Sequence, residues 1–296
     1  MLRWYPQLGY SVVYTLNTSR SNPRRFFLYD HRSNAIEREF DSSDDCCACF
    51  DLSPDGQLLA VKYWGRKHND IVDANSGTVR FGFGPSRVWE VKFDDTATSL
   101  LVKAKSGGLS VYGLAAPHHE LRVAHARDIA DGCSVAGRNE YLIPCRRKGR
   151  VVRIDFDHNE VTQEEIPLKC TVKCIRHSPT APTLFLLDSS GAVSCYDSTL
   201  SEQLWKTKLA PIPADGRIVN GAFSGNGQLI GLAVVHDHGS HTIVLDSSDG
   251  RNLSTLTGVS PGVYPFQETC TLSPMGVVLD LQTGATSDDF CEIADY

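Results

Sequence analysis

The chain of 296 residues has no apolar run of the roughly 18 residues that a membrane-spanning helix needs. Its first residues, Met1-Leu2-Arg3-Trp4-Tyr5-Pro6, lack the charged start and long apolar core of a secretory signal. The chain also has no basic excess, since its formal net charge is −6. We therefore expect a cytoplasmic protein that binds neither a membrane nor nucleic acid.

The sequence also contains no recognisable phosphate-binding or catalytic motif. No stretch keeps the periodicity of an amphipathic helix, so the Gly-rich segments at 82–85 and 225–227 precede no helix that could hold a phosphate. No Ser lies in a nucleophile-elbow pattern. The sequence names no reaction, and we expect no cofactor. Catalytic groups brought together from distant parts of the chain would leave no motif, so an enzyme stays open.

The ten cysteines raise the question of disulfides and metal sites. Cys133, Cys174, Cys195 and Cys270 fall inside strand-like apolar runs, and a chain of this size needs no disulfides to fold. We therefore predict reduced, mostly buried thiols. The cluster Cys46-Cys47-x-Cys49 contains adjacent cysteines, which do not easily converge on one ion.

The most metal-like group is His236-Asp237-His238 with His241, because imidazole and carboxylate at short spacing suit zinc or a harder divalent ion. Its spacing matches no familiar site, and polar residues are expected in the loop where it falls. We expect no metal.

What the sequence does contain is a repeat of a few apolar residues, usually ending in Asp, followed by a polar turn. From Asp30 to Asp280 the six intervals average about 42 residues. A period of roughly 40–45 residues with four strands per unit is typical of a β-propeller. We predict an all-β, seven-bladed propeller of four-stranded antiparallel blades in a single domain, residues 1–296. The expected blades are 2–40, 48–81, 88–123, 129–166, 171–208, 218–256 and 263–290.

The turn chemistry supports this division. The Asp that ends the third strand of a blade can accept backbone N–H groups from the tight turn after it. Gly77, Gly250 and Gly284 then supply the positive φ that such a turn often needs. In the second blade we expect strands at 48–52, 58–63, 70–73 and 78–81.

With these features the chain resembles the WD40-like and quinoprotein-like propellers. The resemblance lies in Ile71-Val72-Asp73-Ala74-Asn75-Ser76-Gly77 and in the turn Leu52-Ser53-Pro54-Asp55-Gly56, and the repeat covers nearly the whole chain. No unit contains a Trp-Asp dipeptide, and none opens with Gly-His. The resemblance therefore implies the architecture alone. A pair of β-sandwiches is the structural alternative.

Charge is unevenly placed along the predicted blades. We label the strands of a blade a to d; the b–c and d–a connections of a propeller gather on one face. Three b–c connections are basic, whereas Asp41, Asp44 and Asp45 would offset part of that field. Trp64 beside Arg has the chemistry of a binding hot spot, although it could equally pack between blades. The predicted partner-binding residues are Arg24, Arg25, Trp64, Arg66, Lys67, Arg146, Arg147, Lys148 and Arg150.

These observations favour a non-catalytic propeller that binds another protein with an acidic surface through its b–c/d–a face. A scaffold and a stoichiometric inhibitor, for example a toxin-neutralising immunity protein, both suit such a molecule. Solvated loop charges without a partner are the plainer explanation of the basic residues. The alternative function is a propeller enzyme or small-ligand binder that uses the central channel.

Overall fold

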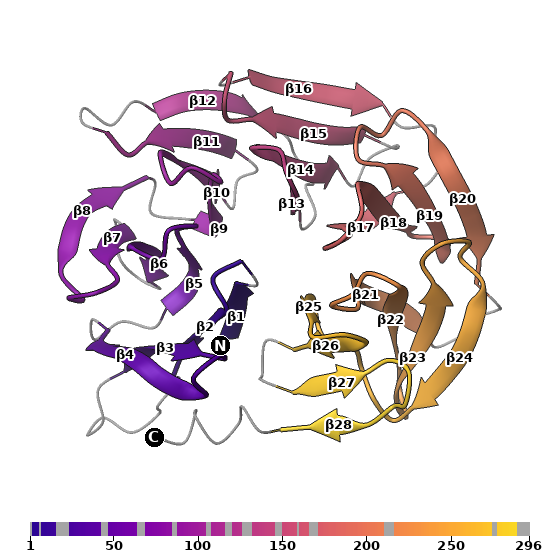
Figure 1. Cartoon of the computed structure of the whole chain (residues 1–296). Helices are drawn as coiled ribbons and strands as arrows, with labels where there is room; N and C mark the ends of the chain where they lie inside the picture. The colour runs from indigo at the N-terminus through magenta and orange to yellow at the C-terminus, as the bar shows by residue number, and fades with distance from the viewer. Residues whose placement is uncertain are drawn as a thin grey trace. The chain divides into compact units, whose positions relative to one another are not determined.

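The computed structural model describes residues 2–5, 7–15, 24–42, 47–63, 69–84, 88–104, 108–115, 120–125, 132–145, 150–158, 160–165, 171–209, 216–273 and 277–288. Every regular element in these segments is a β-strand (Figure 1). The described residues include no helix long and apolar enough to span a membrane. The strands form seven four-stranded antiparallel sheets, each in chain order. The chain is thus a seven-bladed β-propeller, as the repeat predicted.

The blades fall into two compact units, each considered by itself. Unit 1 comprises Met1–Arg127, Asp155–Val161 and Ile293–Tyr296, and unit 2 comprises Asp128–Ile154 and Thr162–Glu292. Unit 1 contains blades 1 to 3. Their strands are β1 (Leu2–Tyr5), β2 (Tyr10–Tyr14), β3 (Arg25–Asp30), β4 (Ala35–Asp41), β5 (Cys47–Leu52), β6 (Leu58–Tyr63), β7 (Asn69–Asp73), β8 (Val79–Phe83), β9 (Val88–Phe93), β10 (Ser99–Ala104), β11 (Gly108–Gly113) and β12 (Glu120–His125).

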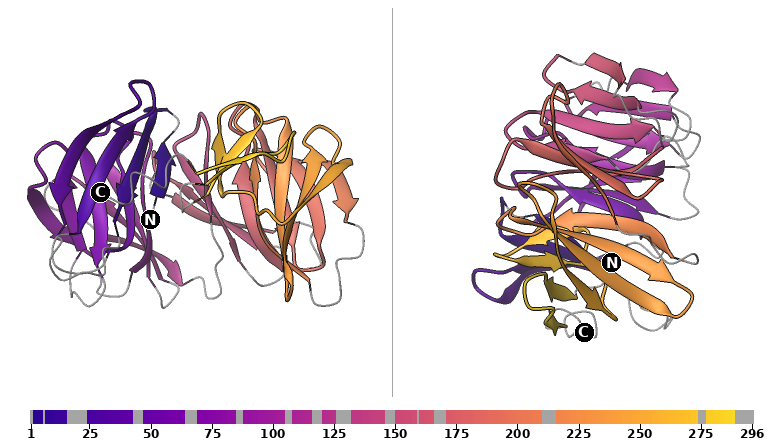
Figure 2. Two further views of the ribbon diagram at one scale, coloured as in Figure 1. Left: turned by 90° about the horizontal axis from the view of Figure 1, so that it is seen from below. Right: turned by 90° about the vertical axis from the view of Figure 1, so that its right-hand side faces the viewer.

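Unit 2 contains blades 5 to 7 and most of blade 4, whose segment Asp155–Val161 is grouped with unit 1. The views in Figure 2 show the strands of these blades side by side. They are β13 (Cys133–Val135), β14 (Glu140–Cys145), β15 (Arg150–Asp155), β16 (Glu160–Glu165), β17 (Val172–His177), β18 (Thr183–Asp188), β19 (Ala192–Asp197), β20 (Gln203–Lys208), β21 (Arg217–Phe223), β22 (Leu229–His236), β23 (Gly239–Asp246), β24 (Asn252–Thr257), β25 (Tyr264–Phe266), β26 (Cys270–Leu272), β27 (Val278–Asp280) and β28 (Thr286–Ser287).

The middle strands of the blades form the core, because neighbouring blades cover them on both faces. All five residues of β7 and five of the six in β6 are buried, whereas the outer strands β20 and β24 alternate exposed and half-buried residues. Apolar clusters join blades 1 and 2 in unit 1 and blades 5 and 6 in unit 2. The predicted strand 58–63 coincides with β6, and the other three of that blade agree within two residues.

The turns between strands c and d use Asp as predicted. Asp30 Oδ1 accepts the Arg32 N–H at 2.9 Å, and Asp246 Oδ1 accepts the Ser248 N–H at 2.9 Å. The Arg32 amide lowers the pKa of Asp30, and the Ser248 hydroxyl lowers the pKa of Asp246. The same turn bond occurs at Asp73, Asp197 and Asp280, whereas Asp155 accepts the N–H of His158, three residues on. Gly77, Gly250 and Gly284 have φ of 70°, 73° and 76°, the positive values that the sequence predicted.

A buried carboxylate joins the a strands of the three blades of unit 1. The Asp51 side chain on β5 is only 2% exposed and accepts four donors. Arg3 Nη1 on β1 and Lys92 Nζ on β9 each lie 3.3 Å from it, the Tyr5 hydroxyl donates at 3.0 Å, and the Phe93 N–H donates at 2.8 Å. Asp51 therefore connects its own blade to the blade on either side.

Candidate functional site

Each blade is an antiparallel meander, so its b–c and d–a connections leave from the same end, here called the b–c/d–a end. This is the end that the sequence predicted to bind a partner. Of the predicted residues, the structure describes Arg24, Arg25 and Arg150. The others lie outside the described residues: Trp64, Arg66, Lys67, Arg146, Arg147 and Lys148.

Arg25 and Arg150 are strand residues, so their predicted placement in loops was wrong. Each is the first residue of a c strand. Arg25 belongs to the sheet because its backbone C=O accepts the Thr15 N–H, while β4 pairs with it at Asp41. The Arg25 guanidinium forms ion pairs with Glu39 and, at 3.2 Å, with Asp41. Glu39 and Asp41 therefore compensate the charge of Arg25 within blade 1. The sequence analysis expected Asp41 to offset part of the basic charge at this end.

The backbone shows a feature that the sequence did not reveal: a β-bulge near the b–c/d–a end of strand a in four blades. In blade 3, Val88 pairs with Ala104 and Glu90 with Lys103, so Trp89 is the extra residue. The registers of blades 2, 5 and 6 shift in the same way. Bulges turn a side chain out of the regular alternation and often occur next to functional sites. The extra residues are Ala48, Trp89, Lys173 and Val219.

These bulges expose side chains that a regular strand a would not. Trp89 is 56% exposed and Val219 is 45% exposed, although both lie on the innermost strand of a blade. Lys173 is also exposed. Exposed Trp is the residue type most enriched in binding hot spots. The bulged ends of the a strands are therefore the candidate contact sites of each unit.

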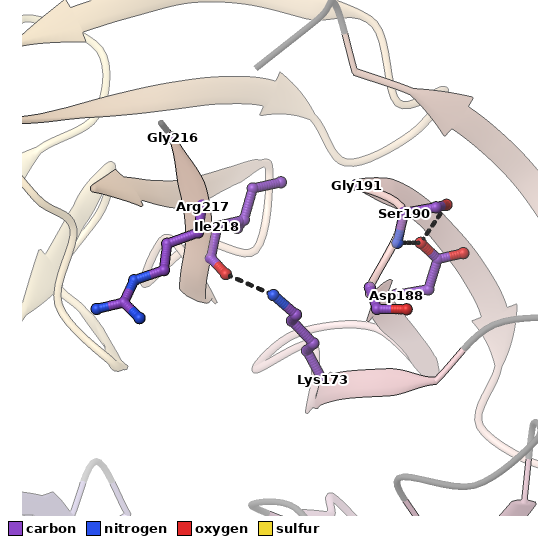
Figure 3. Close-up of a pocket in the computed structure, with 8 residues that line it drawn as sticks. Lys173, Asp188, Ser190, Gly191, Gly216, Arg217 and Ile218 are labelled. Carbon is purple, nitrogen blue, oxygen red and sulfur yellow. Dashed lines mark hydrogen bonds between the residues drawn. The ribbon is translucent and has the colours of Figure 1, made fainter. Parts of the chain in front are cut away.

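In unit 2 the bulges of blades 5 and 6 border a pocket of about 130 Å³. The Lys173 ammonium donates to the Ile218 C=O at 3.4 Å, which directs it toward the neighbouring blade (Figure 3). The opposite wall is the b–c turn of blade 5, where Asp188 Oδ1 accepts the N–H groups of Ser190 and Ala192 at 2.8 and 3.0 Å. Figure 3 shows the Lys173 ammonium between the Arg217 guanidinium and the Asp188 carboxylate, with Arg217 pointing away from Asp188.

The sequence prediction did not include Trp89, Lys173 or Arg217. Each lies within two residues of the start of a predicted a strand, immediately after a d–a connection. A large or charged residue at that position is the signal in the sequence that marks it. The basic residues of the b–c loops stand out in the sequence because several of them are consecutive. Single exposed residues at strand starts give no such run.

Metal-ligand geometry is not found among the described residues, where no three His, Cys, Asp or Glu side chains converge. His236 and His241 lie on paired strands with ring centroids 5.6 Å apart, joined by a two-residue turn. The seven described cysteines form no disulfide. Of the four predicted to lie in strands, Cys174 and Cys195 are buried and Cys133 and Cys270 are half-buried.

Comparison with solved structures identifies the same architecture. The chain is similar to the β-propeller domain of Cps50 (Swd1) from Myceliophteria thermophila, with a TM-score of 0.68 and 12% sequence identity. The similarity covers 96% of this chain and 94% of that domain. The fold is therefore that of a WD40-like β-propeller. No protein-family model and no curated protein sequence matches the chain.

Proposed function

We propose that this chain is a single-domain, cytoplasmic, non-catalytic propeller that binds another protein through the b–c/d–a ends of its blades. The observation that supports this most directly is the exposed Trp89 at a bulge of an innermost strand. A half-exposed indole supplies a large rigid contact area to a partner. The absence of disulfides among the seven described cysteines agrees with a reducing compartment.

The pocket between blades 5 and 6 is small for an enzyme site. Its volume of about 130 Å³ is well below the roughly 300–1,000 Å³ of ordinary small-molecule sites. A protein partner needs no deep cavity, because it covers a surface and inserts single side chains. We therefore favour a scaffold or a stoichiometric inhibitor, such as a toxin-neutralising immunity protein, over a propeller enzyme.

The test places a photo-crosslinking amino acid at position 89 and, as a matched control, at Val79. Val79 is 59% exposed but belongs to the outer strand β8 of the same unit. A protein crosslinked at 89 and not at 79 is then purified and titrated against the protein. Trp89→Ala should weaken binding by about 2 kcal/mol, roughly thirtyfold, and Val79→Ala by less than about twofold. Equal crosslinking at both positions, or equal affinities, would contradict the proposal.

A further inference from the structure

We propose that the pocket between blades 5 and 6 binds a single carboxylate side chain, Asp or Glu, of the partner protein. This inference rests on the proposed function and names the chemistry of one contact. Its elements are the bulged Lys173 on β17, Arg217 at the start of β21 and the b–c turn Asp188–Gly191. All of them belong to unit 2.

The cations of the pocket retain hydrogen-bond donors. An ammonium has three donors, and Lys173 uses one of them on the Ile218 C=O. Arg217 forms no ion pair with a described residue, and its guanidinium offers five donors in a planar fork that matches a carboxylate. These groups favour an anionic ligand.

Asp188 restricts where an anion can lie. Its Oδ1 is occupied by the turn, since the Ser190 N–H, the Ser190 hydroxyl and the Ala192 N–H all donate to it. Asp188 lines the same pocket as Lys173, yet the two form no ion pair. An incoming carboxylate would be repelled by Asp188 and attracted to the opposite wall. It would therefore lie between Lys173 and Arg217, the arrangement that Figure 3 allows.

The pocket is small, about 130 Å³, and partly open to solvent. A side-chain carboxylate can enter it while the rest of the partner chain stays outside. Val219, exposed at the neighbouring bulge, offers an apolar contact to the partner backbone or to a residue beside the acid. A protein side chain is the ligand that combines these contacts.

The experiment uses the full chain, isotopically labelled, and the probe N-acetylglutamate N-methylamide. We expect saturable NMR shifts at the amides of Ser190, Gly191 and Arg217, and none with the matched glutamine derivative. Lys173→Gln and Arg217→Gln should each weaken probe binding about three- to tenfold. Arg251→Gln is the control, because Arg251 is an exposed cation at the opposite end of blade 6.

Three results would overturn the inference. The first is equal shifts with the glutamate and glutamine probes, and the second is an equal loss of affinity in Arg251→Gln and Arg217→Gln. The third is inorganic phosphate saturating the same amides at lower concentration than the carboxylate. Each of these would leave the Trp89 crosslinking result intact, so failure of the pocket and failure of the proposed function are distinguishable.

Discussion

Replacing Asp51 by Asn tests the account of how unit 1 is stabilised. The change keeps the size of the side chain but leaves one acceptor oxygen, whereas the Tyr5 hydroxyl and the Phe93 N–H donate to different oxygens of Asp51. It removes the negative charge that compensates Arg3 and Lys92, each 3.3 Å away. The variant thus removes the charge and one acceptor oxygen while the size of the side chain stays the same.

The expected cost follows from burial. Removing one member of a fully buried ion pair costs about 3–5 kcal/mol. Here Asp51 is 2% exposed, but the Arg3 and Lys92 side chains are 21% and 24% exposed, so water can partly solvate them in the variant. We therefore expect a loss of about 2–4 kcal/mol in the free energy of unfolding. For a chain of 296 residues this lowers Tm by about 3–6 °C.

Calorimetry and urea unfolding of Asp51→Asn provide the measurement, with Asp249→Asn as control. Asp249 is an exposed acid whose Oδ2 lies 3.9 Å from Arg251, a contact that should be worth less than about 1 kcal/mol. If the two variants lose the same stability, the buried carboxylate does not hold the three blades together and the reasoning is refuted.

Three further outcomes are expected. Burial lowers the pKa of His31 from its ordinary value of 6.5 to about 4. Between these two pH values the unfolded chain binds more protons than the folded chain, so the stability of the fold should fall as pH falls from 6.5 to about 4. His31→Gln should reduce this pH dependence of Tm. Gly250→Ala should destabilise more than Gly258→Ala, because both have positive φ but only at Gly250 would the new Cβ meet Trp205, at 2.5 Å. Thiol reagents at pH 8 should label the folded protein slowly at three sites whose pKa burial raises: Cys47, Cys49 and Cys195.

Each of these has a result that contradicts it. An unchanged pH profile in His31→Gln would mean that another group controls acid stability. Equal losses in the two glycine variants would show that positive φ alone, and not the contact with Trp205, sets the cost. Labelling of the three thiols as fast as in the unfolded chain would show that the blades open readily on the timescale of the reaction.

Much of the fold is determined by the sequence alone, because propeller blades are built from local contacts. The spacing of Asp30, Asp73, Asp246 and Asp280 gave the period, since each carboxylate binds the amides of the turn immediately after it. Strands defined by continuous apolar runs, such as β6, were found with their correct bounds. Such features involve residues a few positions apart and can be read without knowledge of the rest of the chain.

The proposed contact residues and the partners of Asp51 were decided only by the tertiary structure. Asp51 contacts Arg3, 48 residues earlier, and Lys92, 41 residues later, and no local pattern marks such a set of partners. A bulge is a register shift between two strands, and its extra residue depends on which residues of strand b pair around it. Ala48, Trp89, Lys173 and Val219 share no side-chain chemistry. What they share is a position in the pairing of two strands, which exists only once the blade has formed.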